Sequence, residues 1–589
     1  MMMSSPLIWS AELLQTLVNR GVSHAVISPG SRSAPVTMAA ALHPALQTHV
    51  YLDERSAAFT ALGIGKATGR PALLICTSGT ATANYFPAVI EARQSGVPMI
   101  LLTADRPPHL RGTGSSQTID QIKLYGDYAI FFHETGEPQT GRPDLKRLRE
   151  AGKQAVRKSI FFGGPAHINL PFRKPLEPSA GDIKTVLNEI YTNGTSKSLT
   201  SQQQHDLTEA VSSATGAESE SAALCFGQAM HLAPPVRSLL SSSKRPLIVA
   251  GPAMPHHCPV GFLQNLKTAL NAPVIAEPGS SVGKETGTLL RYEQFLRNAV
   301  TREELRPDLI IRFGDQPFTR SLLDAFELWD RTPVIHFQSR ISDQDQVLSI
   351  TQHQQIHPAG QADLTFLVQP ADEKWLDKWK GYETESEKQL AAALSAQSGF
   401  TDGHVFHHLD TVFPTFWNRM ISNSFPVRDT ALFGKTTGRQ FVNRGAAGID
   451  GIISTGLGIH FASENPTLAV TGDLAFLHDS NALLSVKESA NPFVIIVINN
   501  GGGTIFRMLP LNRAGAPLAG SDTFRRFFET PQHADIGKLA AAHQIPFLKI
   551  TKTTELQCLH PDQLTGNLIV ECVTDADASM ALRNRLWGT

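Results

Sequence analysis

The chain has 589 residues, and its 52 lysines and arginines nearly cancel its 53 aspartates and glutamates. This length exceeds what one hydrophobic core usually supports, so we expect roughly two to four domains. The balanced charge and the lack of a long basic run argue against nucleic acid as the main partner. No apolar run is long enough to span a bilayer, and the start MMMSSPLIWS lacks the pattern of a secretory signal. We therefore expect a cytoplasmic protein that does not contact a membrane.

Short apolar runs followed by Gly- or Ser-rich turns open the chain: HAVISPG, HVYLDE, ALLICTSGTATAN and PMILLTADRP. Helical stretches separate these runs, which is typical of a parallel α/β sheet. In the second run, Glu54 follows a short strand and begins a helix of small residues. Without further context, Glu54 is a helix-start carboxylate favoured by the helix dipole. Asp53 and Arg55 are interpreted as a solvated or locally paired charge cluster.

The later segments predict a central α/β domain and, after it, a C-terminal domain whose order of strands and helices is like that of the N-terminal domain. A polar stretch over residues 191–222 indicates a linker, and RPLIVAG, APVIAE, DLIIRFGD and TPVIHF indicate strands of a third α/β domain. A charged helix around 375–396 follows. Leu73–Asp105 and Leu468–Asn500 share the order strand, turn, helix, strand, so the two outer domains should have related topology. The predicted boundaries are 1–190, 191–222 (linker), 223–370, 371–399 (connecting helix) and 400–589.

The segment Gly472–Phe506 carries the clearest chemistry. A strand delivers Asp473, a helix follows, and a second strand ends in Asn-Asn-Gly-Gly-Gly at residues 499–503. The carboxyl ends of adjacent parallel strands meet at one edge, so Asp473 and Asn500 should lie side by side. A carboxylate, a carboxamide and a backbone carbonyl at Gly502 are hard ligands suited to Mg²⁺ (or Mn²⁺) with a bound diphosphate. The alternative is an ordinary strand pair with polar turns.

Five cysteines are scattered without a CxxC pair or metal-ligand spacing. We expect buried free thiols in a reducing compartment. They are Cys76, Cys225, Cys258, Cys558 and Cys572.

The spacing from Gly472-Asp473 to Asn499-Asn500 resembles the thiamin diphosphate fingerprint, in which Leu474 stands where Gly is usual. Three α/β domains with related outer ones also resemble thiamin diphosphate-dependent decarboxylases and carboligases. This resemblance implies that Glu54 is the catalytic carboxylate on the aminopyrimidine ring of the cofactor. It also implies that the cofactor lies between domains of different subunits, in a homodimer or a dimer of dimers.

Seven motifs narrow the resemblance: SPGSRSAP, LDERSAAF, TSGTATAN, TADRPP, QTIDQ, NRGAAGIDG and the Gly472–Phe506 segment. Together they are similar to the 2-succinyl-5-enolpyruvyl-6-hydroxy-3-cyclohexene-1-carboxylate synthase family of menaquinone biosynthesis. That family decarboxylates 2-oxoglutarate and adds the product carbanion to isochorismate in a 1,4-addition. Each substrate carries two carboxylates, so an arginine-rich site is expected.

The resemblance assigns further site residues by their place in these motifs. Cofactor contacts are assigned to Ser424, Asp473, Leu474, Asn500, Gly502, Ile505 and Phe506, besides Glu54. Isochorismate contacts are assigned to Ser31, Arg32, Arg106 and Gln117, with Arg320 contributed by the central domain. Contacts with the succinyl carboxylate, the intermediate or the apolar wall are assigned to Asn423, Arg428, Arg444 and Leu509.

Some positions depart from the family pattern. Ser116 stands where Asn is expected beside Gln117, and His109 replaces a commonly acidic position. His478 is expected to serve packing or the helix start rather than acid–base chemistry. Two other functions stay open at this point: another thiamin diphosphate enzyme, such as a 2-oxo acid decarboxylase or an acetolactate-type synthase, and a scaffold protein that keeps the fold without turnover.

Overall fold

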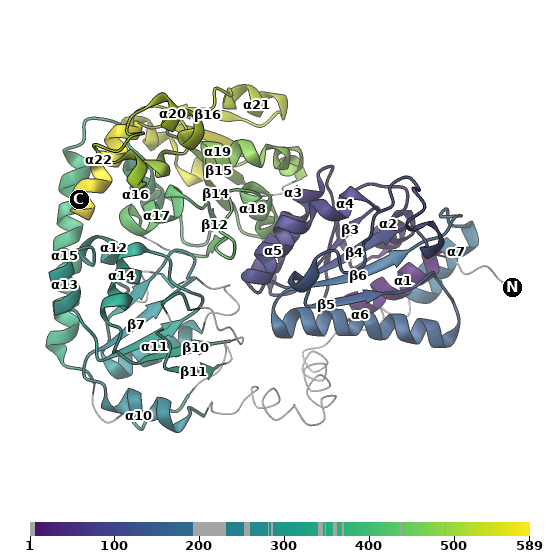
Figure 1. Cartoon of the computed structure of the whole chain (residues 1–589), viewed down its shortest axis with the longest axis horizontal. Coiled ribbons are helices and arrows are strands. Elements are labelled where there is room, and N and C mark those ends of the chain that lie inside the picture. The colour runs from purple at the N-terminus through teal and green to yellow at the C-terminus, as the bar shows by residue number, and fades with distance from the viewer. Residues whose placement is uncertain are drawn as a thin grey trace. The chain divides into compact units, whose positions relative to one another are not determined.

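The computed structural model (Figure 1) describes residues 6–191, 231–252, 259–280, 282–283, 287–339, 345–347, 349–356, 362–367, 370–435, 438–488 and 491–588. The chain divides into two compact units, Met1–Gln228 and Ala229–Thr589. The predicted linker 191–222 lies outside the described residues except for Tyr191, as do Cys225 and Cys258. Among the described residues, no helix combines the length and apolar character that crossing a bilayer requires.

The first unit contains a six-stranded parallel sheet in the order β2-β1-β3-β4-β6-β5. Its strands β1, β3, β4 and β6 are buried along their whole length, because helices cover both faces of the sheet. The strands are β1 His24–Ile27, β2 Gln47–Val50, β3 Ala72–Cys76, β4 Met99–Asp105, β5 Phe131–Glu134 and β6 Pro165–Pro171.

Helices α1, α2 and α6 share one hydrophobic cluster with this sheet, while α3 packs with α5 and contacts β1 and β3. Helix α3 begins where the Asp53 side chain accepts the Arg55 N–H, and it ends at Gly69 in the left-handed region. The helices of this unit are α1 Pro6–Val18, α2 Ala34–Leu42, α3 Glu54–Thr68, α4 Thr80–Asn84, α5 Phe86–Gln94, α6 Arg142–Phe162 and α7 Ala180–Thr185, with short turns at Pro108–Leu110, Gly126–Tyr128 and Val186–Tyr191.

The second unit contains two parallel sheets. The central one has the order β11-β10-β9-β7-β8, and the last one has the order β13-β12-β14-β15-β17-β16. Ranked along the chain, the first and last sheets share one strand order, and the central sheet differs, which confirms the predicted relation between the outer domains. The strands are β7 Pro246–Ala250, β8 Val274–Ala276, β9 Leu309–Phe313, β10 Val334–Gln338, β11 Gln352–Gln355, β12 Asn418–Ile421, β13 Gln440–Val442, β14 Thr467–Gly472, β15 Phe493–Asn499, β16 Phe547–Ile550 and β17 Leu568–Val573.

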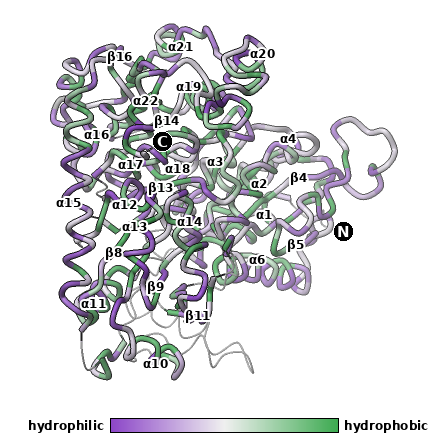
Figure 2. Tube along the Cα trace, turned by 60° about the vertical axis from the view of Figure 1, so that its left-hand side comes forward, coloured by the Kyte–Doolittle hydropathy of each residue, from purple (hydrophilic) through white to green (hydrophobic). Residues whose placement is uncertain are grey.

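The long helix α15 (Glu373–Ser395) confirms the predicted connecting helix and packs on α12 and α22. Figure 2 colours much of it hydrophilic, whereas strands and helices inside the unit are largely hydrophobic. The other helices are α10 Pro234–Ser242, α11 Val260–Leu270, α12 Tyr292–Phe295, α13 Ala299–Glu304, α14 Arg320–Leu328, α16 Asp402–Val412, α17 Phe425–Phe433, α18 Ile452–Phe461, α19 Asp473–His478, α20 Asp522–Phe524, α21 Ile536–Ala542 and α22 Ala576–Trp587. Shorter 3-10 or π segments lie at Ser480–Glu488, Thr504–Met508, Pro510–Asn512, Arg525–Glu529, Thr553–Cys558 and Pro561–Gln563.

Three details differ from the sequence-based expectations. The connection between β14 and β15 is α19 followed by the 3-10 segment Ser480–Glu488, not one helix. Strand β11 is polar, with alternating exposure, and gave no apolar signal in the sequence. Cys76 and Cys572 are buried free thiols as expected, but Cys558 is exposed.

Arg291, directly before α12, binds the end of α17. Its guanidinium is buried and donates to the backbone oxygens of Leu432 and Gly434, at 2.7 and 2.5 Å. Glu387 of α15 pairs with the same side chain at 2.6 Å. These contacts link the segment before α12 to the end of α17 and to α15.

Glu277 anchors the turn that precedes α14. The carboxylate is fully buried and accepts the backbone N–H groups of Phe318 and Thr319, at 2.8 and 3.1 Å, together with the Thr319 hydroxyl. Burial raises the pKa of Glu277 to about 7, although these hydrogen bonds oppose the rise.

The raised pKa predicts a pH-dependent stability. The folded state holds the Glu277 proton more tightly than the unfolded state, so this contribution is complete below about pH 4.5 and is lost as pH rises through about 7. Between pH 5.5 and 8 the free energy of unfolding should fall by about 2 kcal/mol from this group. Glu277→Gln should lack that component in denaturant titrations at both pH values. An unchanged pH slope in Glu277→Gln would contradict the assignment.

Candidate active site

A cavity of about 430 Å³ lies in the C-terminal sheet of the second unit, beside the carboxyl ends of β12, β14 and β15. This is the edge at which parallel α/β sheets usually bind ligands. The cavity brings together ten of the residues predicted from sequence: Asn423, Ser424, Arg428, Arg444, Asp473, Leu474, Asn500, Gly502, Ile505 and Phe506.

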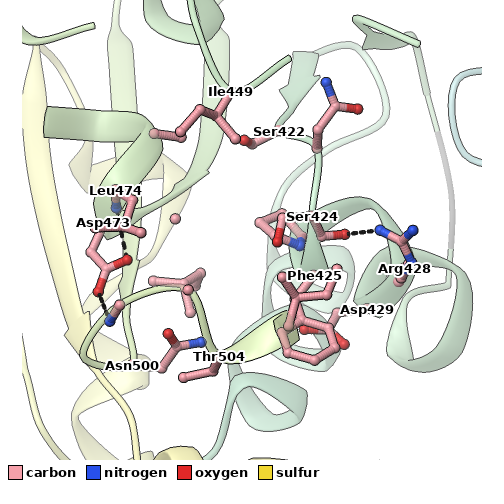
Figure 3. A pocket seen from close by; sticks show the side chains of 18 of the residues that line it. Ser422, Ser424, Phe425, Arg428, Asp429, Ile449, Asp473, Leu474, Asn500 and Thr504 are labelled. Carbon is pink, nitrogen blue, oxygen red and sulfur yellow. Dashed lines mark hydrogen bonds between the residues drawn. The ribbon is translucent and has the colours of Figure 1, made fainter. Parts of the chain in front are cut away.

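The carboxylate of Asp473 is the most constrained group in this cavity. Its Oδ1 accepts the Leu474 N–H and its Oδ2 accepts the Gly502 N–H, both at 2.7 Å (Figure 3). Burial raises the pKa of Asp473 to about 6, and nearby Asp402 adds to the rise, while the backbone hydrogen bonds oppose it. A cation beside the carboxylate would favour its charged form.

Asn500 and Gly502 both lie beside Asp473, Asn500 with its amide and Gly502 with the N–H that donates to the carboxylate. The Nδ2 of Asn500 donates to Asp402 at 3.1 Å, and Figure 3 shows the amide oxygen turned to the Asp473 side of the cavity. Gly502 has φ +123 and lies directly against the chain at Glu529, so this turn needs a glycine. One carboxylate, one amide oxygen and one backbone carbonyl form a hard oxygen set that fits Mg²⁺ or Mn²⁺.

The opposite wall is built on a strained turn after β12. Ser424 has φ +70, which is rare for a residue with a side chain. Its backbone oxygen accepts Nη1 of Arg428 at 2.7 Å. Asn423 is buried, and its side-chain amide hydrogen-bonds the neighbouring backbone. Nδ2 donates to the backbone oxygens of Asn443 and Gly448 at 2.7 Å each.

Arg444 lies where the central sheet meets this wall. It donates to Oδ1 of Asn423 at 3.2 Å, and its guanidinium lies 4.6 Å from the ring centroid of Phe318. Phe318 belongs to the turn that Glu277 holds, just before Arg320. Arg320 is exposed and pairs with Asp324 at 2.7 Å.

Some predicted positions lie outside the set that lines the cavity. Neither Arg320 nor Leu509 lines it. The expectation for His478 was wrong, because this residue is exposed at the last position of α19 rather than packed or at the helix start.

The first unit carries a separate group of cationic side chains at the carboxyl ends of β1 and β4. Arg32 is buried and donates Nη1 to the Phe172 backbone oxygen at 2.7 Å, but its Nε meets no acceptor among the described residues. Burial lowers the pKa of Arg32, Arg106 lowers it further, and Asp105 partly offsets both. The guanidinium groups of Arg32 and Arg106, together with the buried Nε–H of Arg32 that has no acceptor among the described residues, form an arrangement that could bind a carboxylate.

Arg106 is tied to the loop that carries Gln117. Its guanidinium donates to the Ser78 hydroxyl and the Ser116 backbone oxygen, at 3.1 Å each, and to Oε1 of Gln117 at 3.4 Å. Gln117 has φ +53, a second strained non-glycine residue at a predicted site. Ser31 is exposed in the turn before α2.

Gln121 holds these turns together from behind, and the sequence interpretation gave it no role although it ends the QTIDQ motif. It is fully buried, accepts the Gly79 N–H at 3.0 Å, and donates to Ala104 and Asn169 at 3.2 and 3.0 Å. Asn169 also donates to the buried Asp105 at 2.9 Å. A buried polar side chain with every group used fixes the geometry of its surroundings.

Glu54 lies at the first position of α3, as predicted, and is partly buried. Its negative charge acts electrostatically on Cys76, the last residue of β3. Burial raises the pKa of Cys76 to about 12, and the charge of Glu54 adds to that rise. The carboxylate therefore sits at the carboxyl edge of the first sheet, with the positive end of a helix dipole behind it.

Comparison with known proteins agrees with this geometry. The family models "Thiamine pyrophosphate enzyme, N-terminal TPP binding domain" and "Thiamine pyrophosphate enzyme, C-terminal TPP binding domain" match residues 10–124 and 429–562. Three relatives are each named 2-succinyl-5-enolpyruvyl-6-hydroxy-3-cyclohexene-1-carboxylate synthase. The one from Microcystis aeruginosa is 34% identical over 93% of both chains. The one from Bacillus velezensis is 36% identical over 89% of this chain and 86% of its own. The one from Haloarcula marismortui is 34% identical over 98% and 97%.

The Gly502 turn gives a direct test of the cavity. A Cβ at Gly502 would lie 2.4 Å from the Glu529 backbone oxygen, at a φ of +123. Gly502→Ala should therefore displace the turn from Asp473 and weaken thiamin diphosphate binding, measured by calorimetry, at least about tenfold more than Gly501→Ala does, because only the carbon added at Gly502 meets backbone atoms. Gly501→Ala is the control, because Gly501 has φ +83 but nothing within 4 Å of the added carbon. Equal loss in both variants would show that strain, not the clash at Gly502, governs binding.

Proposed function

The chain belongs to the 2-succinyl-5-enolpyruvyl-6-hydroxy-3-cyclohexene-1-carboxylate synthase family, and from this membership we propose that it decarboxylates 2-oxoglutarate and adds the succinyl unit to isochorismate in menaquinone biosynthesis. It is a thiamin diphosphate-dependent transferase of the carboligase type. When bound, thiamin diphosphate supplies a nucleophilic carbon and accepts the electron pair left by CO₂ loss. The protein must hold the diphosphate, direct one proton transfer and bind two dicarboxylic acids.

We assign the metal and diphosphate to the cavity of the second unit. Asp473, Asn500 and the Gly502 carbonyl would hold Mg²⁺ or Mn²⁺, and the open positions of the ion would take diphosphate oxygens. Leu474 and Ser424 line the same cavity and would contact the cofactor. Ile505 and Phe506 supply its apolar surface.

Glu54 is the proposed catalytic residue. Its carboxyl group would hydrogen-bond the ring nitrogen opposite the amino group of the aminopyrimidine and exchange a proton with it. This contact would favour the imino form of the ring, which would supply the base for the reactive carbon. The carboxylate lies at a helix start, which keeps it available as an acceptor.

The proposal that isochorismate is the acceptor substrate rests mainly on Arg32 and Arg106. Isochorismate presents two carboxylates, and the unused buried donor of Arg32 beside a second guanidinium suits one of them. Ser31 and Gln117 lie on the adjoining turns and would hydrogen-bond the same substrate. Ser116 offers a hydroxyl where the family pattern has an amide, and its backbone oxygen already accepts from Arg106.

The succinyl group would bind on the other wall of the cavity. Arg428 and Arg444 supply positive charge there, and Asn423 fixes the position of Arg444 through Oδ1. Arg320 and Leu509 are proposed as substrate contacts from the family resemblance alone, since neither lines the cavity.

The two candidate groups belong to separate units, and the family resemblance assigns them to a shared cofactor. We propose a homodimer or a dimer of dimers, in which Glu54 of one subunit acts with the cavity of another. The predicted boundaries at 190, 222, 370 and 399 are proposed as the limits of the pyrimidine-binding, central and diphosphate-binding domains. The proposed location is the cytoplasm.

The role of Glu54 can be tested by proton exchange. Glu54→Gln should slow exchange of the proton on the reactive carbon of bound thiamin diphosphate at least about 100-fold, because glutamine has no ionisable proton to exchange with the ring nitrogen. Deuterium exchange followed by NMR measures this, and calorimetry should show that the cofactor still binds. Asp53→Asn is the matched control, since asparagine also caps a helix. Exchange at the normal rate in Glu54→Gln would refute the role.

Arg106→Ala should separate the two half-reactions. Decarboxylation of 2-oxoglutarate should continue near its normal rate, while the KM for isochorismate rises at least about tenfold through loss of a charged hydrogen bond. Steady-state kinetics with each substrate varied measures both effects. Arg149→Ala, which removes an exposed arginine paired with Glu12 at 2.9 Å, serves as the control. If both half-reactions fall equally, Arg106 does not belong to the acceptor site.

A further inference from the structure

Behind the cavity lies a fully buried carboxylate that no sequence motif singled out. Asp402 is the first residue of α16 and is 0% exposed. Its Oδ2 accepts Nδ2 of Asn500 at 3.1 Å, across 98 positions of the chain. Asp402 does not line the cavity, so its influence there passes through Asn500.

Three groups from the C-terminal segment fix the Asp402 position. Its Oδ1 accepts the Thr574 hydroxyl at 2.5 Å, its Oδ2 also accepts Nη2 of Arg583 at 2.5 Å, and its backbone N–H donates to the Ser579 hydroxyl at 3.0 Å. Thr574 follows β17, and the other two lie in α22. A buried carboxylate held from both oxygens and from its backbone has one available orientation.

Arg583 is shared with a second buried carboxylate. Its Nε and Nη2 donate to Asp429 at 2.8 and 2.5 Å, and its guanidinium lies 3.7 Å from the ring centroid of Phe425. Both aspartates and the arginine are essentially unexposed. Two carboxylates therefore share one guanidinium, and its charged hydrogen bonds hold both of them in place.

An asparagine amide has two ends of similar shape and opposite chemistry. The oxygen can ligate a metal, whereas the NH₂ group only donates hydrogen bonds and repels a cation. With Nδ2 donating to Asp402, Oδ1 of Asn500 is directed to the Asp473 side of the cavity (Figure 3). Without that acceptor, rotation of the amide would present either end.

We infer that Asp402 is a positioning residue for the metal site: it fixes the Asn500 amide so that the oxygen, not the nitrogen, faces the cation. Arg583, Thr574 and Ser579 hold Asp402 in place for this purpose. The inference rests on the proposed function, in which Asn500 is a metal ligand. Partners of this kind change metal affinity by about 10- to 100-fold when they are removed.

The test measures metal affinity instead of turnover. Mn²⁺ is titrated into the full-length protein with saturating thiamin diphosphate, and free Mn²⁺ is followed by electron paramagnetic resonance. Asp402→Asn should raise the Mn²⁺ Kd about 10- to 100-fold, because an amide at this position no longer imposes one orientation on Asn500. Asp429→Asn is the control. Asp429 shares Arg583 and is similarly buried, and unlike Asp402 it lines the cavity itself, but among the described residues it makes no hydrogen bond to Asn500, so this variant removes the same charge without releasing the Asn500 amide.

We expect the Mn²⁺ Kd of Asp429→Asn to stay within about threefold of that of the wild-type protein, while thermal unfolding shows a comparable loss of stability in both variants. Equal weakening of Mn²⁺ binding in the two variants would overturn the inference, since charge alone would then account for the effect. So would an unchanged Kd in Asp402→Asn.

If Asp402→Asn does not fold, Asp402→Glu decides the question. It keeps the charge beside Arg583 but moves the carboxylate by one methylene, so the same rise in Mn²⁺ Kd is expected and wild-type affinity would overturn the inference. Failure of the proposed metal site itself looks different, because the wild-type protein would then bind no Mn²⁺ in the presence of thiamin diphosphate.

Discussion

The parallel pairing of β14 with β15 is the constraint on which the cavity depends. In this register Gly472 lies opposite Ile498, so the chain leaves both strands at the same edge and Asp473 meets the turn at Gly502. A slip of one residue would turn every side chain of the strand to the other face, and the buried sheet forbids that. The first unit has the same arrangement of paired strands and adjoining turns. Strands β3 and β4 pair with Cys76 opposite Thr103, and the turns after them carry Ser78 and Arg106.

Behind each set of functional side chains lies a buried polar network. In the second unit, Arg583 bridges Asp402 and Asp429, and in the first unit Asp105, Asn169 and Gln121 hold the turns around Arg106. Removing charges from water is costly, and apolar residues of similar volume would often give equal or greater stability. Such networks fix the positions of the side chains in front of them, because a polar group whose hydrogen bonds are all made has only one orientation. The positive φ angles of Gln117 and Ser424 occur at the same two sets of residues, as expected where local conformation serves a site.

The sequence predicted well whatever depends on local pattern. Strand ends located Asp473, Asn500 and Arg106, the helix start located Glu54, and repeated strand–turn–helix order revealed the relation between the outer sheets. Residues whose role depends on distant partners gave no signal. Asp402 is separated by 181 positions from Arg583, and nothing near either residue marks the contact. Strand β11 is polar, so it gave no apolar run by which to predict it. The exposure of His478 depends on the residue at which α19 ends, and the sequence of so short a helix does not determine that residue.

We propose that two sets of residues, one on each unit, serve one carboligation between a 2-oxo acid and a dicarboxylate acceptor. Product analysis tests it most directly, with the purified full-length protein, thiamin diphosphate, Mg²⁺, 2-oxoglutarate and isochorismate in one reaction followed by mass spectrometry. We expect release of CO₂ and formation of 2-succinyl-5-enolpyruvyl-6-hydroxy-3-cyclohexene-1-carboxylate in equal amounts. Release of CO₂ with succinic semialdehyde and no adduct would contradict it, and would make the protein a 2-oxo acid decarboxylase.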